Sequence, residues 1–297
     1  MNLCVFTDEI SKELEHALDV ACECGVESVE LRGLWTQNIA ELDDATAQRT
    51  ADLIASRSLR VASLGSGFGK CDLPSDGMAQ QMDLLRRLAD LADILSAPLI
   101  RGFVFRRPQE ARQPIGGSGA PNAHLRKPDP PQDLWDTALS LFEQPARFVE
   151  ERNLILGIEN EDACWLGRGD ETARFVEALG SPNVGVTWDP GNAYFAGEAP
   201  YPDGYEHVKP YVVHVHAKDA HMDPESGRAR WTTIGDGEIG FEAQLRALAA
   251  DGYQGAVSLE THYTPPGGTR EEGSRMGLAR LREIINAVRA QGGGGAP

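Results

Sequence analysis

The chain has 297 residues, of which 41% are hydrophobic and 25% charged, a composition typical of a globular protein with a substantial core. Its formal net charge of −17 disfavours nucleic acids and anionic membranes as partners, although a local basic pocket remains compatible with a small anionic substrate. No stretch is long and apolar enough to predict a membrane span.

Short apolar runs alternate with longer amphipathic runs along the chain. The short runs predict eight strands: Leu3–Thr7, Ser28–Arg32, Leu59–Leu64, Pro98–Val104, Leu154–Glu159, Val184–Asp189, Tyr211–His216 and Ala256–Glu260. The longer runs predict helices, among them Ser11–Cys24, Ala45–Ser56, Met78–Ser96, Leu134–Glu151, Thr172–Leu179 and Phe241–Ala250. This alternation indicates an α/β protein with a parallel sheet. Eight strands at this spacing favour a single-domain (β/α)8 TIM barrel over an open doubly wound sheet.

We therefore assign residues 1–290 to one barrel domain and the Gly-rich residues 291–297 to a disordered tail. Residues 106–133, directly after the fourth predicted strand, contain six prolines and three glycines, so we expect an insert without regular structure. Its five Lys and Arg residues admit two interpretations. The insert is either a lid over an anionic or polyhydroxyl substrate or a solvated or oligomer-contacting loop.

The N-terminal residues contain neither a basic region nor a long apolar stretch, so we expect no signal peptide. The five cysteines are odd in number and scattered, which argues against a disulfide framework and for a reducing compartment. Together these features predict a cytoplasmic location.

One glycine-rich segment, Leu64–Cys71, is superficially similar to a phosphate-binding loop. A Walker motif would need Gly at position 64 and Ser or Thr at position 71, and the glycines at 65, 67 and 69 do not have dinucleotide-binding spacing. We expect a flexible strand-to-helix loop here. The chain also lacks the G-x-S-x-G motif of many serine hydrolases.

The last four predicted strands each end on a residue able to bind a metal ion: Glu159, Asp189, His216 and Glu260. Because the C-terminal ends of barrel strands converge on one rim, we expect these side chains to lie together. Three neighbouring carboxylates repel one another, and a divalent cation relieves that repulsion. One nitrogen and three oxygens suit Mn²⁺, Co²⁺, Mg²⁺ or Zn²⁺, so the sequence predicts one divalent metal ion.

Residues near these strand ends are candidates for substrate binding: Asn192, Lys218, Arg101 and His262. His214 shares a strand face with His216 but lies deeper, where it fits a core or supporting position. The aromatic residues Trp35, Trp165 and Phe68 are compatible either with a sugar-binding wall or with core packing.

These segments resemble the sugar phosphate isomerase/epimerase family of xylose isomerase-like barrels. The similarity is carried by Ile158-Glu159-Asn160, Trp188-Asp189-Pro190-Gly191-Asn192, His216-Ala217-Lys218-Asp219 and Leu259-Glu260. The resemblance implies one divalent metal ion on the four strand-end ligands and a small polyhydroxyl carbonyl substrate. It also implies that Glu159 and Glu260 are the catalytic acid and base, which move a proton alpha to the carbonyl through a metal-stabilised enediolate.

Two positions depart from the pattern of ketose 3-epimerases: Asn192 stands where many have histidine, and Trp165 where many have glutamate. Both weigh against that particular activity. The main alternative is a metal-dependent dehydratase acting on a keto-inositol or a related keto-sugar. A non-catalytic sugar-binding barrel ranks lower, as does an apurinic endonuclease, which would need more than seven histidines and a basic groove. Pairing of the outer helices into a homo-oligomer is compatible with the fold.

Overall fold

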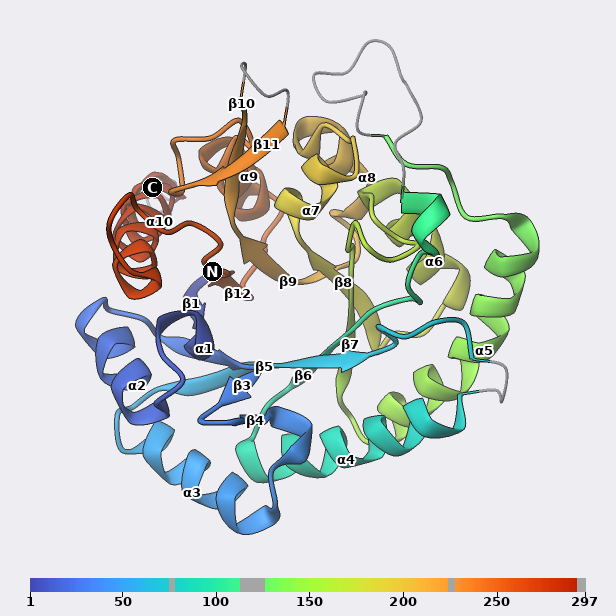
Figure 1. Ribbon diagram of the computed structural model, residues 1–297, viewed down its shortest axis with the longest axis horizontal. Coiled ribbons are helices and arrows are strands. Elements are labelled where there is room, and N and C mark those ends of the chain that lie inside the picture. Colours follow the sequence, from blue (N-terminus) through green and yellow to red (C-terminus); the bar gives the residue numbers. More distant parts are fainter. Residues whose placement is uncertain (75–77, 113–125, 224–227, 293–297) are drawn as a thin grey trace, which may run out of the picture.

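The computed structural model describes residues 1–74, 78–112, 126–223 and 228–292. Eight parallel strands close into a barrel in the order β1-β12-β9-β8-β7-β6-β5-β2 (Figure 1). Their bounds are β1 Asn2–Phe6, β2 Ser28–Leu31, β5 Arg60–Phe68, β6 Leu99–Gly102, β7 Ile155–Glu159, β8 Val184–Trp188, β9 Val212–Ala217 and β12 Ala256–Leu259. Each matches one predicted strand, which confirms the (β/α)8 barrel. The strands form because their apolar runs are buried on both faces.

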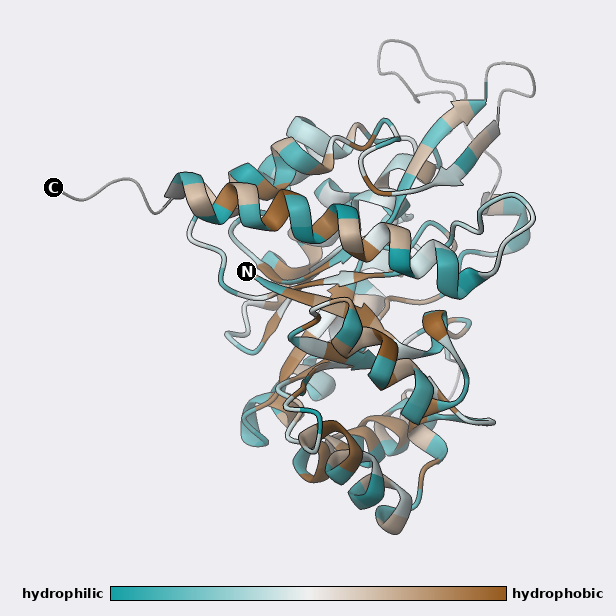
Figure 2. Ribbon diagram, turned by 90° about the vertical axis from the view of Figure 1, so that its left-hand side faces the viewer, coloured by the Kyte–Doolittle hydropathy of each residue, from teal (hydrophilic) through white to brown (hydrophobic). Residues whose placement is uncertain are grey.

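The longer helices surround the strands in chain order (Figure 1). They are α2 Leu14–Glu23, α3 Asp44–Ala55, α4 Ala79–Leu95, α5 Gln132–Glu151, α6 Gly169–Leu179, α9 Phe241–Ala250 and α10 Arg270–Gly292. Each carries an apolar face toward the barrel and polar residues outward, and Figure 2 shows both kinds of residue along α10. No helix among the described residues is long and apolar enough to cross a membrane.

Several shorter elements lie outside the eight-stranded barrel. They are α1 Thr7–Ile10, α7 Pro190–Phe195, α8 Tyr205–Val208, the 3-10 helices η1 Ile39–Glu41 and η2 Gln109–Arg112, and the π-helix η4 Pro200–Gly204. Two antiparallel pairs join β3 Gly33–Leu34 to β4 Gln37–Asn38, and β10 Asp219–Asp223 to β11 Arg228–Thr232. The β10–β11 hairpin follows β9 almost directly and projects from the barrel (Figure 2).

The expectation of a flexible loop at Leu64–Cys71 is wrong over most of its length, because β5 continues to Phe68. Glycine allows close packing inside the barrel in this segment, and does not make it a flexible loop. A Cβ at Gly65 would lie 2.9 Å from Cε1 of Phe6, so only glycine fits inside the barrel at this position. The Phe103 amide donates to the Phe68 carbonyl at 2.8 Å, which extends the pairing of the strand.

The expectation that residues 106–133 have no regular structure is wrong at both ends of the segment. Gln109–Arg112 form η2, and α5 begins at Gln132, directly after Pro131, whose extended backbone precedes the first helical turn. Residues 113–125 lie outside the described residues, so neither the lid nor the solvated-loop interpretation is tested. The predicted tail lies outside them from residue 293.

Candidate metal centre

The four strand-end residues meet at the C-terminal rim of the barrel. Glu159 ends β7, Asp189 follows β8, His216 lies near the end of β9 and Glu260 follows β12. One donor atom from each lies within 4.8 Å of the donor atoms of the other three, and all four side chains are buried. The strand ends therefore converge as their positions in the sequence suggest. That they bind a metal ion stays a prediction.

The donor atoms at this cluster fit a cation. Nδ1 of His216 lies 3.4 Å from Oε1 of Glu159 and 3.7 Å from Oδ2 of Asp189. Among the described residues, buried Nδ1 of His216 has no hydrogen-bond partner, whereas Oε2 of Glu159 and Oδ2 of Asp189 are ion-paired with Arg101 and Lys218. A divalent ion between the carboxylates and the imidazole would give Nδ1 a partner. One imidazole nitrogen with three carboxylates suits a first-row divalent metal or Mg²⁺.

The charges of the cluster are strongly coupled. Burial raises the pKa of Glu159, but Arg101 and His216 outweigh it and lower that pKa to about 2. For Glu260, burial likewise raises the pKa, and the Lys218 ammonium outweighs it and holds the pKa well below its usual range. Burial lowers the pKa of His216, whereas Glu30 and Glu159 outweigh it and hold the pKa well above its ordinary value. Without a metal ion, Arg101, Lys218 and the His216 imidazole therefore share the positive charge that stabilises the carboxylates.

Two of the candidate substrate-binding residues lie against these carboxylates. Asp189 caps α7, since its Oδ1 accepts from the Asn192 amide at 2.8 Å, and this places the Asn192 side chain beside the cluster. Nδ2 of Asn192 donates to Oε1 of Glu159 at 2.9 Å. The buried Nζ of Lys218 lies 2.8 Å from Oδ2 of Asp189 and 2.7 Å from Oε2 of Glu260.

The other two candidates lie on either side of the cluster. Arg101, on β6, places Nη1 3.2 Å from Oε2 of Glu159. Nε2 of His262 is 3.6 Å from Oε1 of Glu260, and its ring centroid is 4.7 Å from that of Trp231 on β11. All four candidates thus lie at the centre, and their contact with a substrate stays a prediction.

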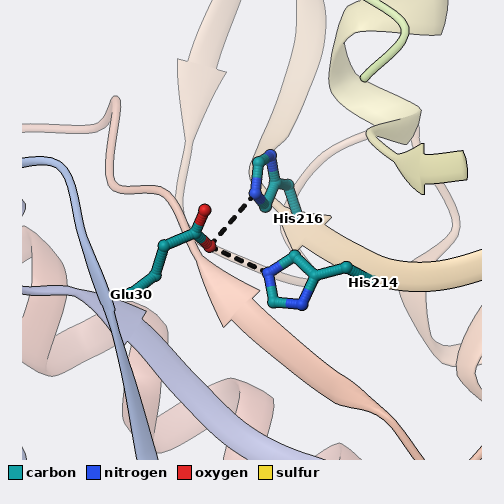
Figure 3. Close-up of side chains that lie close together, drawn as sticks. All are labelled: Glu30, His214 and His216. Carbon is teal, nitrogen blue, oxygen red and sulfur yellow. Dashed lines mark hydrogen bonds and ion pairs between the residues drawn. The ribbon is translucent and has the colours of Figure 1, made fainter. Parts of the chain in front are cut away.

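Glu30, on β2, is a central residue that sequence reasoning missed. Its Oε2 lies 3.2 Å from Nε2 of His216 and 2.8 Å from Nε2 of His214, and Figure 3 shows both rings turned toward this carboxylate. Nδ1 of His216 is thereby left facing Glu159 and Asp189. The available signal was a lone glutamate inside the apolar run Ser28–Leu31.

Sequence reasoning also missed Arg32 and Lys70. Nη1 of Arg32 lies 2.8 Å from Oε1 of Glu260, and Nζ of Lys70 lies 2.5 Å from Oε2 of Glu161. The signal for Arg32 was its position at the end of a predicted strand, on the same rim as the ligands.

The three aromatic residues singled out in the sequence pack elsewhere. Phe68 is buried against Phe142, the Trp165 ring lies under the Arg107 guanidinium, and the Trp35 Nε1 donates to Glu15. Their core-packing interpretation therefore fits better than a sugar-binding wall. Aromatic rings near the cluster include Phe6, which packs on His216, together with Trp231 and Phe103.

Comparison with known proteins gives a family match over most of the chain: the model of the xylose isomerase-like TIM barrel family matches residues 18–284. A 3-oxo-isoapionate decarboxylase of Pectobacterium atrosepticum is 26% identical over 155 residues, which are 51% of this chain and 54% of that protein. An inosose dehydratase of Geobacillus thermodenitrificans is 23% identical over 154 residues, 47% of this chain and 51% of that protein. The chain thus matches about half the length of these curated relatives.

Solved structures resemble the chain over nearly its whole length. The IOLI protein with a bound zinc atom superposes with a TM-score of 0.77 at 15% identity, covering 97% of this chain and 99% of that one. An L-ribulose 3-epimerase superposes with a TM-score of 0.71 at 18% identity, covering 98% and 96%. At these identities the likeness establishes the fold alone.

Proposed function

Since the chain belongs to the xylose isomerase-like TIM barrel family, we propose that it is a divalent-metal-dependent isomerase or epimerase of a small sugar or sugar phosphate. The observation that carries the proposal is the buried cluster of Glu159, Asp189, His216 and Glu260, in which one donor atom from each lies within 4.8 Å of the others and Nδ1 of His216 lacks a hydrogen-bond partner among the described residues. The epimerase and the zinc-containing protein among the structural neighbours support the same assignment.

The cluster combines ligands and bases in one place. A divalent cation held by the four side chains would act as a Lewis acid toward the carbonyl and neighbouring hydroxyl oxygens of the substrate. Glu159 and Glu260 stand at the two ends of the cluster, because β8 and β9 lie between β7 and β12 in the barrel. Each stays ionised because its pKa is lowered, which also makes it a weak base, and a metal ion bound there would have to acidify the α carbon for either to remove its proton.

In this mechanism, one of the two glutamates removes the proton from the carbon next to the carbonyl. Return of the proton by the same carboxylate to the adjacent carbon gives isomerisation, whereas delivery by the other carboxylate to the opposite face gives epimerisation. Asn192 fixes the orientation of Glu159 through its hydrogen bond to Oε1. Lys218 and Arg32 fix Glu260 through both of its oxygens.

A dehydratase acting on a keto-inositol or a related keto-sugar is the second candidate. The observation that favours it is the pair of proton donors beside Glu260, namely Lys218 at 2.7 Å and His262 at 3.6 Å. After removal of the α proton, either group is placed to protonate a departing β-hydroxyl, which leaves as water. The inosose dehydratase among the relatives supports this alternative.

The nuclease alternative finds little support. The second group of metal-competent residues in the described part of the chain is Glu30, His214 and His216, and it shares His216 with the first group. A multi-zinc nuclease would need more histidines at the rim than the two that these groups hold. A binding protein without turnover is distinguished only by the assay for activity.

Deuterium uptake from heavy water into a panel of ketoses, ketose phosphates and polyhydroxy keto-acids, with Mn²⁺-loaded protein, tests the proposal. We expect exchange at a carbon beside the carbonyl, reduced at least about 100-fold in Glu159→Gln and Glu260→Gln. The exposed Glu151→Gln, at the end of α5, is the matched control.

A product lighter by one water would favour the dehydratase. Metal binding without exchange or dehydration on any member of the panel would contradict the enzyme proposal and leave a binding role.

A further inference from the structure

The half of the barrel that supplies no candidate metal ligand supplies cations to the site instead. A cavity of about 220 Å³ opens beside the cluster, and Glu159 and Glu260 form part of its wall. Its other wall includes Arg32 directly after β2, Lys70 after β5 and Arg101 on β6. Three carboxylates, Glu159, Glu161 and Glu260, line the same cavity, so an anion is expected to bind only where a metal ion takes over a carboxylate that now pairs with one of the cations.

Arg101 and Lys70 are held at the same aromatic ring. The Cζ atom of Arg101 lies 4.9 Å from the centroid of Phe103, and Nζ of Lys70 lies 4.6 Å from it. The positive charges of Arg101 and Lys70 repel each other. Their attraction to the Phe103 ring offsets only part of that repulsion. A bound anion in contact with both would remove it.

Metal binding would weaken the ion pair that Arg101 now makes. In the part of the chain that the structure describes, its one carboxylate partner within ion-pair distance is Glu159, a candidate metal ligand. Nη2 donates to the Ser66 carbonyl at 3.2 Å, and Nε is buried without a hydrogen-bond partner. A cation on Glu159 would compete with Arg101 for the same carboxylate, so the nearly buried guanidinium would need a new anionic partner.

Lys70 lies at the outer edge of the cavity. Its side chain is 33% exposed, and its Nζ is paired with Oε2 of Glu161 at 2.5 Å. Arg32 differs from both, because it remains anchored by Asp8 and Glu9 besides Glu260. The anion is therefore expected between Arg101 and Lys70, with Arg32 holding Glu260 in place.

We propose that Arg101 and Lys70 bind a carboxylate of the substrate, so that the substrates are polyhydroxy keto-acids and neutral ketoses are poor ones. This inference rests on the proposed function and names its substrate class. The planar guanidinium of Arg101 matches a carboxylate in geometry. The carbonyl and a hydroxyl of the same molecule remain for the metal centre on the opposite wall of the cavity.

The test compares three probes that differ only in the group at C6: D-fructose, D-fructuronate and D-fructose 6-phosphate. Dissociation constants are measured by calorimetry on Mn²⁺-loaded protein. We expect the keto-acid to bind at least about tenfold more tightly than either of the others. Equal binding of the acid and the neutral ketose, or tightest binding of the phosphate, would overturn the assignment of a carboxylate site.

Two variants and a control locate the preference. Arg101→Met is expected to reduce the preference for the acid over fructose to within about threefold, and Lys70→Met to reduce it partly. Arg49→Met, an exposed arginine that pairs with Glu15, should leave it unchanged. Circular dichroism and Mn²⁺ affinity verify that each variant folds, and Lys70→Met at the outer edge keeps the test decisive if Arg101→Met does not fold. A preference retained in the folded variants would contradict the inference.

The outcomes separate this inference from the proposed function. Deuterium exchange into neutral ketoses without any preference for the acid would leave the proposed function standing and overturn the carboxylate site. A preference for the acid that persists in metal-free protein unable to bind Mn²⁺ would support the anion site and contradict the proposed function.

Discussion

His216 can direct only one ring nitrogen at the carboxylate cluster, and Glu30 determines which one. Nε2 of His216 lies beside Oε2 of Glu30, so Nδ1 faces Glu159 and Asp189 (Figure 3). A carboxylate in this position fixes the tautomer and the orientation of a metal-binding imidazole and raises its basicity. We therefore expect Glu30 to affect the site through its contact with His216 and not to contact the substrate.

Replacing Glu30 by Gln should weaken Mn²⁺ binding about 10- to 100-fold, because the neutral amide supports the imidazole less well. Calorimetric titration of metal-free protein measures the effect independently of turnover. Glu27→Gln, a partly buried glutamate one residue before β2 that pairs with Arg289, is the control. Unchanged affinity in Glu30→Gln would show that this carboxylate does not support the ligand.

The four candidate ligands were predictable because each ends an apolar run, and barrel geometry brings such ends together. Glu30 was not predictable in the same way. It lies inside its strand, and its partner His216 is 186 positions away in the sequence. The contact depends on how the register of β2 and β9 orients their inward side chains, which a single sequence does not specify.

At the scale of elements, buried arginines connect the segment after β6 to the loop between β7 and α6. Nε and Nη2 of Arg107 donate to the carbonyls of Cys164 and Trp165 at 2.7 and 2.9 Å, and Nη1 donates to the carbonyl of Pro128. Arg168 pairs with Asp129 in the same region. Both sides of the predicted insert are therefore fastened to the rim of the barrel.

Arg107→Met should lower the free energy of unfolding by at least about 2 kcal/mol, because several buried carbonyls would lose their donor. Arg106→Met is the matched control, since the neighbouring side chain is exposed. Urea unfolding of both variants makes the comparison. Equal midpoints for the two variants would contradict a structural role for Arg107.

Strand-forming patterns allowed prediction of all eight barrel strands, because parallel strands buried on both faces are nearly continuous apolar runs. The same rule failed where glycine or polar residues interrupt such runs. The end of β5 was missed at Gly65–Gly67, and the hairpin β10–β11 was missed because its residues are largely polar. Both missed elements border the site, where substrate binding and packing impose different requirements on the sequence.

For the whole molecule, the proton on His216 links metal binding to pH. Burial lowers the pKa of this imidazole, but Glu30 and Glu159 outweigh it and raise the folded-state value well above the ordinary one. A raised pKa stabilises the metal-free fold below the unfolded-state value of about 6.5, and this contribution is lost as the pH rises through the folded-state pKa. A metal ion must displace that proton, so its affinity should increase with pH.

The increase in Tm on adding a fixed concentration of Mn²⁺ should therefore be larger at about pH 8.5 than at about pH 6.5. Differential scanning fluorimetry at both values, with and without a chelator, measures it. An increase in Tm that is equal at the two pH values, or larger at the lower pH, would contradict the link between metal binding and the proton on His216.

Metal stoichiometry and affinity test the central claim most directly. Mn²⁺ is titrated into chelator-treated wild type, His216→Ala and His262→Ala, the last being a histidine beside the cluster that is not among the four ligands. We predict about one ion per chain in the wild type and in His262→Ala, and at least about 100-fold weaker binding in His216→Ala. A wild-type protein that binds neither Mn²⁺ nor Co²⁺, Zn²⁺ or Mg²⁺, or a His216→Ala variant with unchanged affinity, would contradict the account.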